Sequence, residues 1–353
     1  MAKTIGQILP AGDEAARETA ARLLRKGALV ALPTETVYGL GADATQGSAV
    51  RAIYAAKGRP AYNPLICHVD GPEMAHRHVI VPEAADRLMK HFWPGPLTLV
   101  LKRRPDSTIA REVTAGLDTL AVRCPDVSAA RDVIRRLGRP VAAPSANLSG
   151  HVSPTTPAHV SEDMLTGVAL ILDAGPTRLG IESTIVGIDD AGVSLLRPGS
   201  ITAEQIMDTT GMPLQQQDRH AASGSGRTPA VTAPGQLASH YAPSAAVRLN
   251  TTAPAPGRVR IGFGRSSGDF NLSPDGDLRE AAANLFAMLR AADARLGAGA
   301  TGEIAIAPIP AEGIGIAIND RLSRAAAPKN ARQDEERDMA EPAPDNGTGI
   351  STP

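Results

Sequence analysis

The chain has 353 residues, of which 42% are hydrophobic and 21% charged, and its formal net charge is −1. That length accommodates two domains, and that composition is typical of a globular protein. A charge near zero with only 3% aromatic residues argues against a protein that holds nucleic acid through its overall field or by stacking bases on aromatic rings.

The sequence also lacks the marks of exported, membrane and disulfide-rich proteins. Its two cysteines, Cys67 and Cys124, are too few for a disulfide framework or a zinc site, and they fit reduced thiols. The first residues have no continuous apolar segment, and no apolar run approaches the roughly 18 residues of a membrane span. We therefore expect a soluble, cytoplasmic protein without a membrane segment.

Hydrophobic spacing predicts short strands mixed with helices over the first 210 residues. The predicted helices are 13–26, a short helix that ends at 57, 82–91, 126–137, 157–165 and 203–209. The predicted strands are 29–32, 65–69, 97–101, 119–122, 141–143, 168–172, 183–188 and 193–196. We expect one α/β domain, residues 1–210, built on a twisted mixed sheet with flanking helices.

The composition changes at Gly211. Residues 211–243 contain few large apolar side chains and many Gln, Ser, Gly and Pro, which indicates a linker. Residues 244–326 follow a β-α-β-α order, with strands at 259–263 and 303–307 and helices at 278–296 and 316–326, which predicts a small parallel-sheet domain. The tail, 327–353, is too polar to build a core and is expected to be disordered.

One stretch near the N-terminus gathers polar groups that indicate chemistry. An apolar strand ends at Pro33, and hydroxyl and acid groups follow at residues 34–36, before a Gly-Leu-Gly segment that we expect to turn. A helix then delivers Lys57 and Arg59, with Gly58 between them, at its exit. A Lys-x-Arg pair alone is typical of surface charge, but at a helix exit it also suits the binding of phosphates.

A second polar segment follows the apolar run 141–143. A strand that leads directly into Pro-Ser-x-Asn places Ser145 and Asn147 at its carboxyl end, where ligands collect in α/β proteins. A hydroxyl and an amide there suit contact with phosphate oxygens, or with a Mg²⁺ ion and its waters.

Several short segments together carry a family resemblance. They are PTETVYGLG at 33–41, KGRP at 57–60, NPL at 63–65, WPGPLT at 93–98, AVR at 121–123, PSANLSG at 144–150, LRPG at 196–199 and HYAP at 240–243. In this order they resemble the YrdC/Sua5 family, and the two-domain layout resembles its Sua5 branch, the threonylcarbamoyl-AMP synthases. The resemblance implies a YrdC-like fold for the first domain and a small Rossmann-like C-terminal α/β domain.

The resemblance implies a nucleotidyltransferase. The amine of L-threonine takes up bicarbonate or CO₂, and the carbamate attacks the α-phosphate of ATP, which is bound with Mg²⁺. Pyrophosphate leaves, and the product is L-threonylcarbamoyladenylate. A downstream threonylcarbamoyl-transferase complex would use it to form N6-threonylcarbamoyladenosine at position 37 of tRNAs that read codons beginning with adenine. A weak contact with tRNA is a further expectation.

The resemblance also assigns residues to the site. The catalytic set would be Lys57, Arg59, Ser145 and Asn147. ATP would contact Arg59, Asn63, Thr119, Ser145, Ser153, Arg197 and Tyr241, the last as a lid from the linker. Threonine would contact Thr36, His68, Arg123, Ala143 and Ser183, with Arg123 as the partner of its carboxylate. No protein side chain is assigned to a metal.

Each of these side chains has an ordinary structural alternative when it is considered alone. Arg123, directly after a strand, also suits a surface ion pair, and His68 suits a core or edge histidine. Thr36 and Ser183 would serve equally as caps of turns. Trp93 favours packing over ligand contact. The joint match favours the site, most strongly for the catalytic set.

Three other patterns are interpreted as coincidental. The segment GLGADA at 39–44 fits the dinucleotide fingerprint formally, but no acid follows about twenty residues later. The GFG at 262–264 is equally weak, and the sequence has no Walker A motif. His68, His76 and His78 resemble a metal cluster, but we expect His76 and His78 to be solvated.

Two competing functions remain for this fold. Related domains make a carbamoyl-adenylate in hydrogenase maturation, but those proteins carry acylphosphatase and zinc-finger segments, which are not found in this sequence. A non-catalytic RNA-binding or ribosome-associated module would use a basic concave surface, against which the pI of about 6.7 argues. The sequence therefore favours the enzyme.

Overall fold

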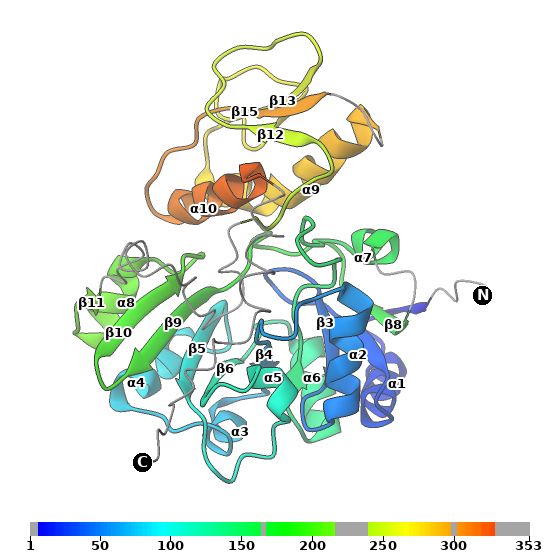
Figure 1. Cartoon of the computed structure of the whole chain (residues 1–353), viewed down its shortest axis with the longest axis vertical. Helices are drawn as coiled ribbons and strands as arrows, with labels where there is room; N and C mark the ends of the chain where they lie inside the picture. The colour runs from blue at the N-terminus through cyan, green and yellow to red at the C-terminus, as the bar shows by residue number, and fades with distance from the viewer. Residues whose placement is uncertain (1–5, 164–166, 216–238, 298–301, 329–353) are drawn as a thin grey trace, which may run out of the picture.

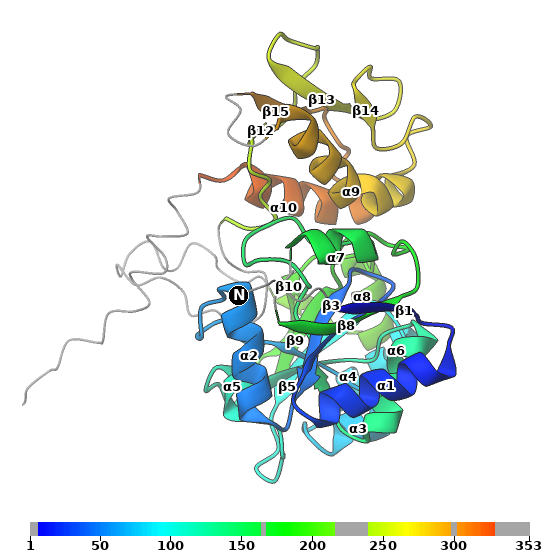
Figure 2. The same ribbon diagram turned by 90° about the vertical axis from the view of Figure 1, so that its right-hand side faces the viewer.

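The computed structural model describes residues 6–163, 167–215, 239–297 and 302–328. These residues form one sheet of eleven strands and another of four. Figure 1 shows the smaller sheet and its helices above the larger unit, and Figure 2 shows the same arrangement from the side. The disorder expected for the tail concerns residues that lie, apart from 327 and 328, outside the described ones.

The larger sheet is mixed, as the sequence predicted. In spatial order its strands are β1 (Gln7–Pro10), β8 (Val168–Asp173), β2 (Leu29–Leu32), β3 (Gly39–Asp43), β7 (Val141–Ala142), β4 (Ile66–His68), β6 (Thr119–Arg123), β5 (Leu97–Lys102), β9 (Thr184–Asp189), β10 (Gly192–Arg197) and β11 (Leu214–Gln215). β4 and β6 run parallel, as do β5 and β9, whereas β5 and β6 run antiparallel. The predicted fold class is confirmed.

Helices flank this sheet, and several end where the sequence predicts. They are α1 (Glu14–Arg25), α2 (Gly47–Lys57), α3 (Pro72–His76), α4 (Glu83–Phe92), α5 (Arg111–Thr114), α6 (Ser128–Leu137), α7 (Pro157–Asp163) and α8 (Ala203–Thr210). The Asp13 carboxylate accepts the Ala15 amide at 2.9 Å and caps α1. α2 ends because Gly58 adopts a left-handed conformation with φ of 57°, which places Lys57 at the predicted helix exit.

The Gly-Leu-Gly segment, expected to turn, is part of strand β3. A Cβ on Gly39 would lie 3.2 Å from the Cβ of Ala143, and one on Gly41 would lie 3.0 Å from Cγ1 of Val141. The glycines therefore allow close approach of β7 to β3 rather than a reversal of the chain. Their place inside a strand also separates them from the strand-to-helix turn that a dinucleotide fingerprint requires.

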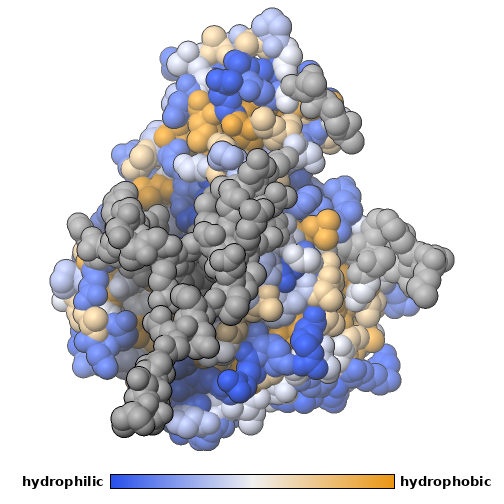
Figure 3. All heavy atoms as spheres, viewed as in Figure 1, coloured by the Kyte–Doolittle hydropathy of each residue, from blue (hydrophilic) through white to orange (hydrophobic). Residues whose placement is uncertain are grey.

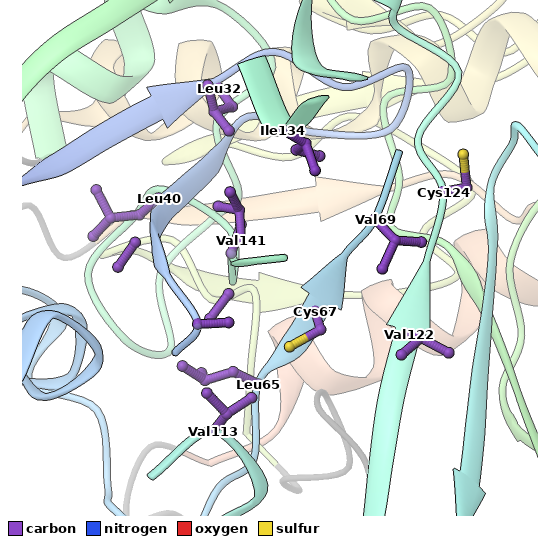
Figure 4. Packing of buried hydrophobic residues seen from close by; sticks show 14 of the residues in the cluster. Leu32, Leu40, Leu65, Cys67, Val69, Val113, Val122, Cys124, Ile134 and Val141 are labelled. Carbon is purple, nitrogen blue, oxygen red and sulfur yellow. The ribbon is translucent and has the colours of Figure 1, made fainter. Parts of the chain in front are cut away.

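The two faces of the sheet serve different purposes because successive side chains of a strand point to opposite sides. On one face Cys67, Val122 and Val141 join the main hydrophobic core, and Figure 4 shows them together from neighbouring strands. Both cysteines are free and buried.

On the other face a smaller apolar cluster lies next to polar groups. It consists of Ile66, Val100, Ala121, Ile185 and Leu196. His68 and Arg123 follow two residues after Ile66 and Ala121, so they project from this second face at the carboxyl ends of β4 and β6.

The smaller sheet is entirely parallel, which confirms the predicted C-terminal α/β unit. Its strands, in spatial order, are β12 (Ala246–Arg248), β15 (Glu303–Ile306), β13 (Arg258–Gly262) and β14 (Phe270–Asn271). Figures 1 and 2 both place α9 (Leu278–Leu296) and α10 (Ile314–Ala326) between this sheet and the larger unit. In Figure 3 hydrophobic residues of the described surface form small groups among polar ones. None of the described helices is long and apolar enough to span a bilayer.

The expected solvation of two histidines holds for only one of them. His76 is exposed on α3. His78 is buried, and its Nδ1 lies 3.2 Å from the Ser107 hydroxyl. The expectation is wrong for His78 because the chain enters the protein interior directly after α3, where the Ser107 hydroxyl contacts the imidazole.

Candidate active site

A polar cavity lies against the second face of the larger sheet. Its lining residues are Thr34, Thr36, Val37, Gly39, Arg59, Ile66, His68, Arg123, Ala143, Pro144, Ser145, Glu182, Ser183, Arg197, His240 and Tyr241. The structure thus brings nine of the predicted site residues to one cavity: Thr36, Arg59, His68, Arg123, Ala143, Ser145, Ser183, Arg197 and Tyr241.

Three more predicted residues adjoin the cavity through lining residues. The Lys57 ammonium donates to the carbonyl of Ser145 at 2.6 Å and to that of Asn147, which ties the exit of α2 to the Pro-Ser-x-Asn segment. Arg59 Nη2 donates to Asn63 Oδ1 at 2.6 Å. Lys57 and Arg59 are 2% and 9% exposed, so the alternative of surface charge does not apply.

The remaining two predicted residues, Ser153 and Thr119, do not line the cavity. Ser153 is buried and donates to the Glu182 carboxylate at 2.6 Å, so it reaches the cavity through that acid. Thr119 begins β6, whereas Arg123 ends it, and the two share a face because they are four residues apart. Thr119 is not among the described residues that line the cavity.

Arg123 lies in a network that is closed to solvent. Its Nη2 donates to Glu35 Oε1 at 2.6 Å, and its Nη1 donates to the Thr36 hydroxyl at 2.9 Å. Its Nε donates to the Gly95 carbonyl at 3.3 Å. The side chains of Arg123 and Glu35 are 4% and 2% exposed, which rules out a surface ion pair. Since a guanidinium carries five N–H donors, this network leaves capacity for an anion in the cavity.

A second buried guanidinium lines the same cavity. Arg197 Nε donates to the Ser183 carbonyl and Nη2 to its hydroxyl, both at 3.1 Å. The Ser183 and Thr98 hydroxyls lie 2.8 Å apart, which joins the residue before β9 to β5 at this point. Burial lowers the pKa of Arg197, and Arg123 is among the nearby cations that lower it further. Two guanidinium groups near one cavity favour an anionic ligand.

Both histidines of the cavity are neutral near pH 7. Burial, and then the charge of Arg123, lowers the pKa of His68 to about 3. Burial, and then Arg59 and Lys57, lowers the pKa of His240 well below its ordinary value. A neutral imidazole has one acceptor nitrogen, so these rings are able to accept hydrogen bonds as well as donate them.

Several buried polar atoms of the site have no hydrogen-bond partner among the described residues. They are Asn63 Nδ2, His68 Nδ1, Asn147 Oδ1, His240 Nδ1 and Tyr241 Oη. An unsatisfied buried polar atom costs about 1–3 kcal/mol, so such atoms are rare in cores. His68, His240 and Tyr241 line the cavity, and their unpartnered atoms there suit a polar ligand.

Sequence reasoning left three charged groups of this region without a role. Glu35 lies within a quoted motif, and Glu182 directly precedes Ser183, so their acidic character was a usable signal. Arg321 of α10 donates to Glu182 across 139 positions of sequence. Nothing near Arg321 in the sequence indicates that contact.

The fold and the site together define a two-domain α/β protein with an enclosed, cation-rich cavity. A family model described as "Telomere recombination" (Sua5_yciO_yrdC) matches residues 22–199, and one described as "Threonylcarbamoyl-AMP synthase, C-terminal domain" matches residues 201–327. The chain belongs to the Sua5/YciO/YrdC family.

Relatives that span most of the chain include two proteins named threonylcarbamoyl-AMP synthase. The Bacillus subtilis protein is 42% identical over 87% of this chain and 92% of its own length, and the Pyrococcus abyssi protein is 40% identical over 87% and 93%. The solved structure of P. abyssi Sua5 complexed with L-threonine is 38% identical, with a TM-score of 0.79 over 92% of this chain and 97% of that one.

Proposed function

We propose that this protein is a threonylcarbamoyl-AMP synthase. It would convert L-threonine, bicarbonate or CO₂, and ATP to L-threonylcarbamoyladenylate and pyrophosphate, for N6-threonylcarbamoyladenosine formation in tRNA. The observation that carries the proposal is that buried cations and unsatisfied polar atoms line one cavity, in a chain that aligns over 87% of its length with a synthase.

The Arg123 end of the cavity suits threonine. Arg123 keeps donor capacity toward the cavity, and Glu35 fixes its orientation from behind, so a carboxylate would meet a preorganised fork. Thr36, Ala143 and Ser183 surround this end and would contact the amino acid. Because His68 is neutral there, its ring would accept or donate a hydrogen bond without adding charge.

The segments joined by Lys57 suit the phosphates of ATP. Nucleotidyl transfer requires little covalent chemistry from the protein and depends mainly on positioning and charge neutralisation. Lys57, Arg59 and Arg197 would supply positive charge, and Ser145 would donate to a phosphate oxygen. Lys57 also holds the Ser145 and Asn147 backbone in place, so its loss would displace that segment.

Magnesium fits this site only in company with the nucleotide. No group of three or more His, Cys, Asp or Glu side chains in the described parts of the chain is placed to hold a metal ion. Asn147 Oδ1, however, is a buried oxygen without a partner among the described residues, and hard cations take oxygen ligands. Ser145 and Asn147 would hold the ion or its waters. Bound there, Mg²⁺ would neutralise charge on the phosphates.

The larger assignments follow from the same proposal. Residues 1–210 would be the catalytic domain, 211–243 the linker and lid, and 244–326 a C-terminal domain that steadies the lid. Tyr241, predicted to close over ATP, lines the cavity with a φ of 60°, a strained value for a residue with a side chain.

The buried free thiols suit a reducing cytoplasm. A threonylcarbamoyl-transferase complex would take the product.

Pyrophosphate release tests the proposed reaction. We expect release from ATP that requires both threonine and bicarbonate, with a nucleotide product of the mass of threonylcarbamoyladenylate. Release that requires carbamoyl phosphate instead would assign the protein to carbamoyl transfer. No release under any condition would favour the non-catalytic module.

The catalytic set has its own test. We expect Lys57→Ala and Ser145→Ala to lose nearly all turnover while the melting temperature shows that the fold is kept, because Lys57 holds the proposed phosphate-binding segment and Ser145 lines the cavity. Lys102→Ala, an exposed lysine at the end of β5, is the matched control and should retain activity. Full activity in Lys57→Ala would contradict the assigned role.

A further inference from the structure

One side chain of the smaller domain enters the site region of the larger one. Arg321 projects from α10 and is fully buried. Its Nε donates to Glu182 Oε2 at 3.0 Å, and its Nη1 donates to the Pro198 carbonyl at 2.7 Å. Asp320 also accepts from Nη1, at 2.9 Å. Arg321 therefore contacts both the acid on the cavity wall and the turn that follows Arg197.

Glu182, the acid that Arg321 contacts, also contacts a residue that we propose binds ATP. Glu182 lines the cavity, and its second oxygen, Oε1, accepts the Ser153 hydroxyl at 2.6 Å. One carboxylate thus joins a residue of α10 to a residue proposed to contact ATP. Because each oxygen has a different partner, the carboxylate plane is fixed at both ends.

Arg321 also supports the aromatic side chain proposed as a lid. Its guanidinium carbon lies 5.5 Å from the centroid of the Tyr241 ring, within the range of a cation–π contact. The same ring stacks on Phe286 of α9 with a centroid distance of 5.6 Å. The two helices of the smaller domain therefore hold Tyr241 against the cavity.

We propose that Arg321 is a positioning residue for ATP binding, which acts from the C-terminal domain by orienting Glu182, and with it Ser153, and by fixing Tyr241. This role rests on the proposed function, because it takes the cavity to be the ATP site. A buried carboxylate that loses its cation becomes unfavourable as an anion and reorients or takes up a proton. Ser153 then loses its acceptor, and the lid loses its support.

A second ion pair across the same domain interface provides a matched control. Arg290 of α9 pairs with Asp163 of α7 and donates to the Val152 carbonyl. Its side chain and that of Asp163 are each 14% exposed, and neither residue lines the cavity. Arg290→Ala thus weakens the interface without removing a contact to Glu182 or Tyr241.

The test compares Arg321→Ala, Arg321→Lys and Arg290→Ala in the full chain. We expect Arg321→Ala to weaken ATP binding about tenfold, the effect of one buried charge-assisted hydrogen bond. The KM for threonine should change about twofold or less, since Arg123 is untouched. Arg321→Lys should restore part of the ATP affinity. Arg290→Ala should lower the melting temperature and leave ATP affinity as in the wild type.

Equal ATP affinities in Arg321→Ala and Arg290→Ala would overturn the proposal and leave Arg321 an interface residue. If Arg321→Ala does not fold, Glu182→Gln replaces it: the amide keeps the size of the side chain but removes the charge that orients it, and unchanged ATP affinity would again overturn the proposal. Direct titration with ATP separates this result from the reaction. Wild-type protein that binds ATP without releasing pyrophosphate contradicts the proposed function alone, while wild-type protein that does not bind ATP overturns both.

Discussion

The guanidinium of Arg123 is buried, and the neighbouring carboxylate of Glu35 compensates its charge. The two groups lie 2.6 Å apart, and Glu35 Oε2 also accepts the Asp126 amide at 2.9 Å. Removal of one partner from a buried pair typically costs 3–5 kcal/mol, because the other charge stays buried. Glu35 therefore fixes the orientation of Arg123, which we propose binds the carboxylate of threonine.

The neutral state of His68 predicts a dependence of stability on pH. The pKa of His68 falls from 6.5 to about 3 on folding, chiefly through burial and then through Arg123. The unfolded chain thus binds a proton that the folded chain excludes. This stabilisation is complete above about pH 6.5 and declines as the pH falls from there toward about 3.

Urea unfolding at pH 7.5, 6 and 5 measures this effect. We expect the free energy of unfolding to decrease as the pH is lowered from 7.5 to 5. The decrease should be smaller in His68→Gln, because glutamine does not titrate. Equal slopes in the two proteins would show that His68 does not supply the dependence. His76→Gln is the matched control, since His76 is exposed and should leave the slope as it is.

Among the elements, those with a strong local pattern were predictable. The α1 helix has an apolar face and a terminal glycine, and α2 ends at Gly58, so both follow from sequence. Strands β1, β11, β12 and β14 were not predicted, because each has only two to four residues and depends on a partner strand rather than on its own alternation.

Some residues of the candidate site were likewise predictable from sequence, and others were not. Lys57 ends a helix and Ser145 follows a strand, so the sequence indicated each segment as a place for a ligand. The Arg123–Glu35 pair joins residues 88 positions apart, and only the folded sheet brings them together. Arg321 lies on an ordinary amphipathic helix, where an arginine is typical of a solvated surface, so its burial had no local signal.

The turn after β10 offers a test at the scale of the element. A Cβ on Gly199 would lie 2.3 Å from the Thr184 amide nitrogen, which is backbone and has little room to shift. We expect Gly199→Ala to lower the free energy of unfolding by about 1–3 kcal/mol through overpacking. Gly71→Ala is the control, since φ is 178° there and, apart from its chain neighbours, no heavy atom of the described residues lies within 4 Å of the added carbon. Equal stability of the two variants would contradict this account.

At the scale of the molecule, the two domains share a hydrophobic cluster. Val37, Val152 and Ile181 of the larger domain pack in one cluster with Tyr241 and residues of α9 and α10. A Cβ on Gly180 would lie 2.4 Å from the carbonyl oxygen of Ala283, which shows how closely α9 approaches the larger domain. Residues of α9 and α10 thus pack behind Val37 and Tyr241, which line the cavity.

Removal of residues 211–353 tests this dependence. We expect the truncated chain to bind ATP more weakly, because Tyr241, His240 and Arg321 leave the site, while Lys57 and Ser145 remain. ATP titration of the truncated and full chains measures the difference, and circular dichroism checks that the larger domain stays folded. An ATP affinity equal to that of the full chain would contradict the prediction.

The position of Arg321 near the end of the described chain also bears on protein synthesis. A ribosome releases the larger domain first, and domains generally fold as units from the N-terminus. Until α10 emerges, Glu182 lacks its cation and Tyr241 lacks its support from that helix. A nascent chain that stops before α10 therefore contains the residues that line the cavity but lacks the contacts of Arg321 with Glu182 and Tyr241.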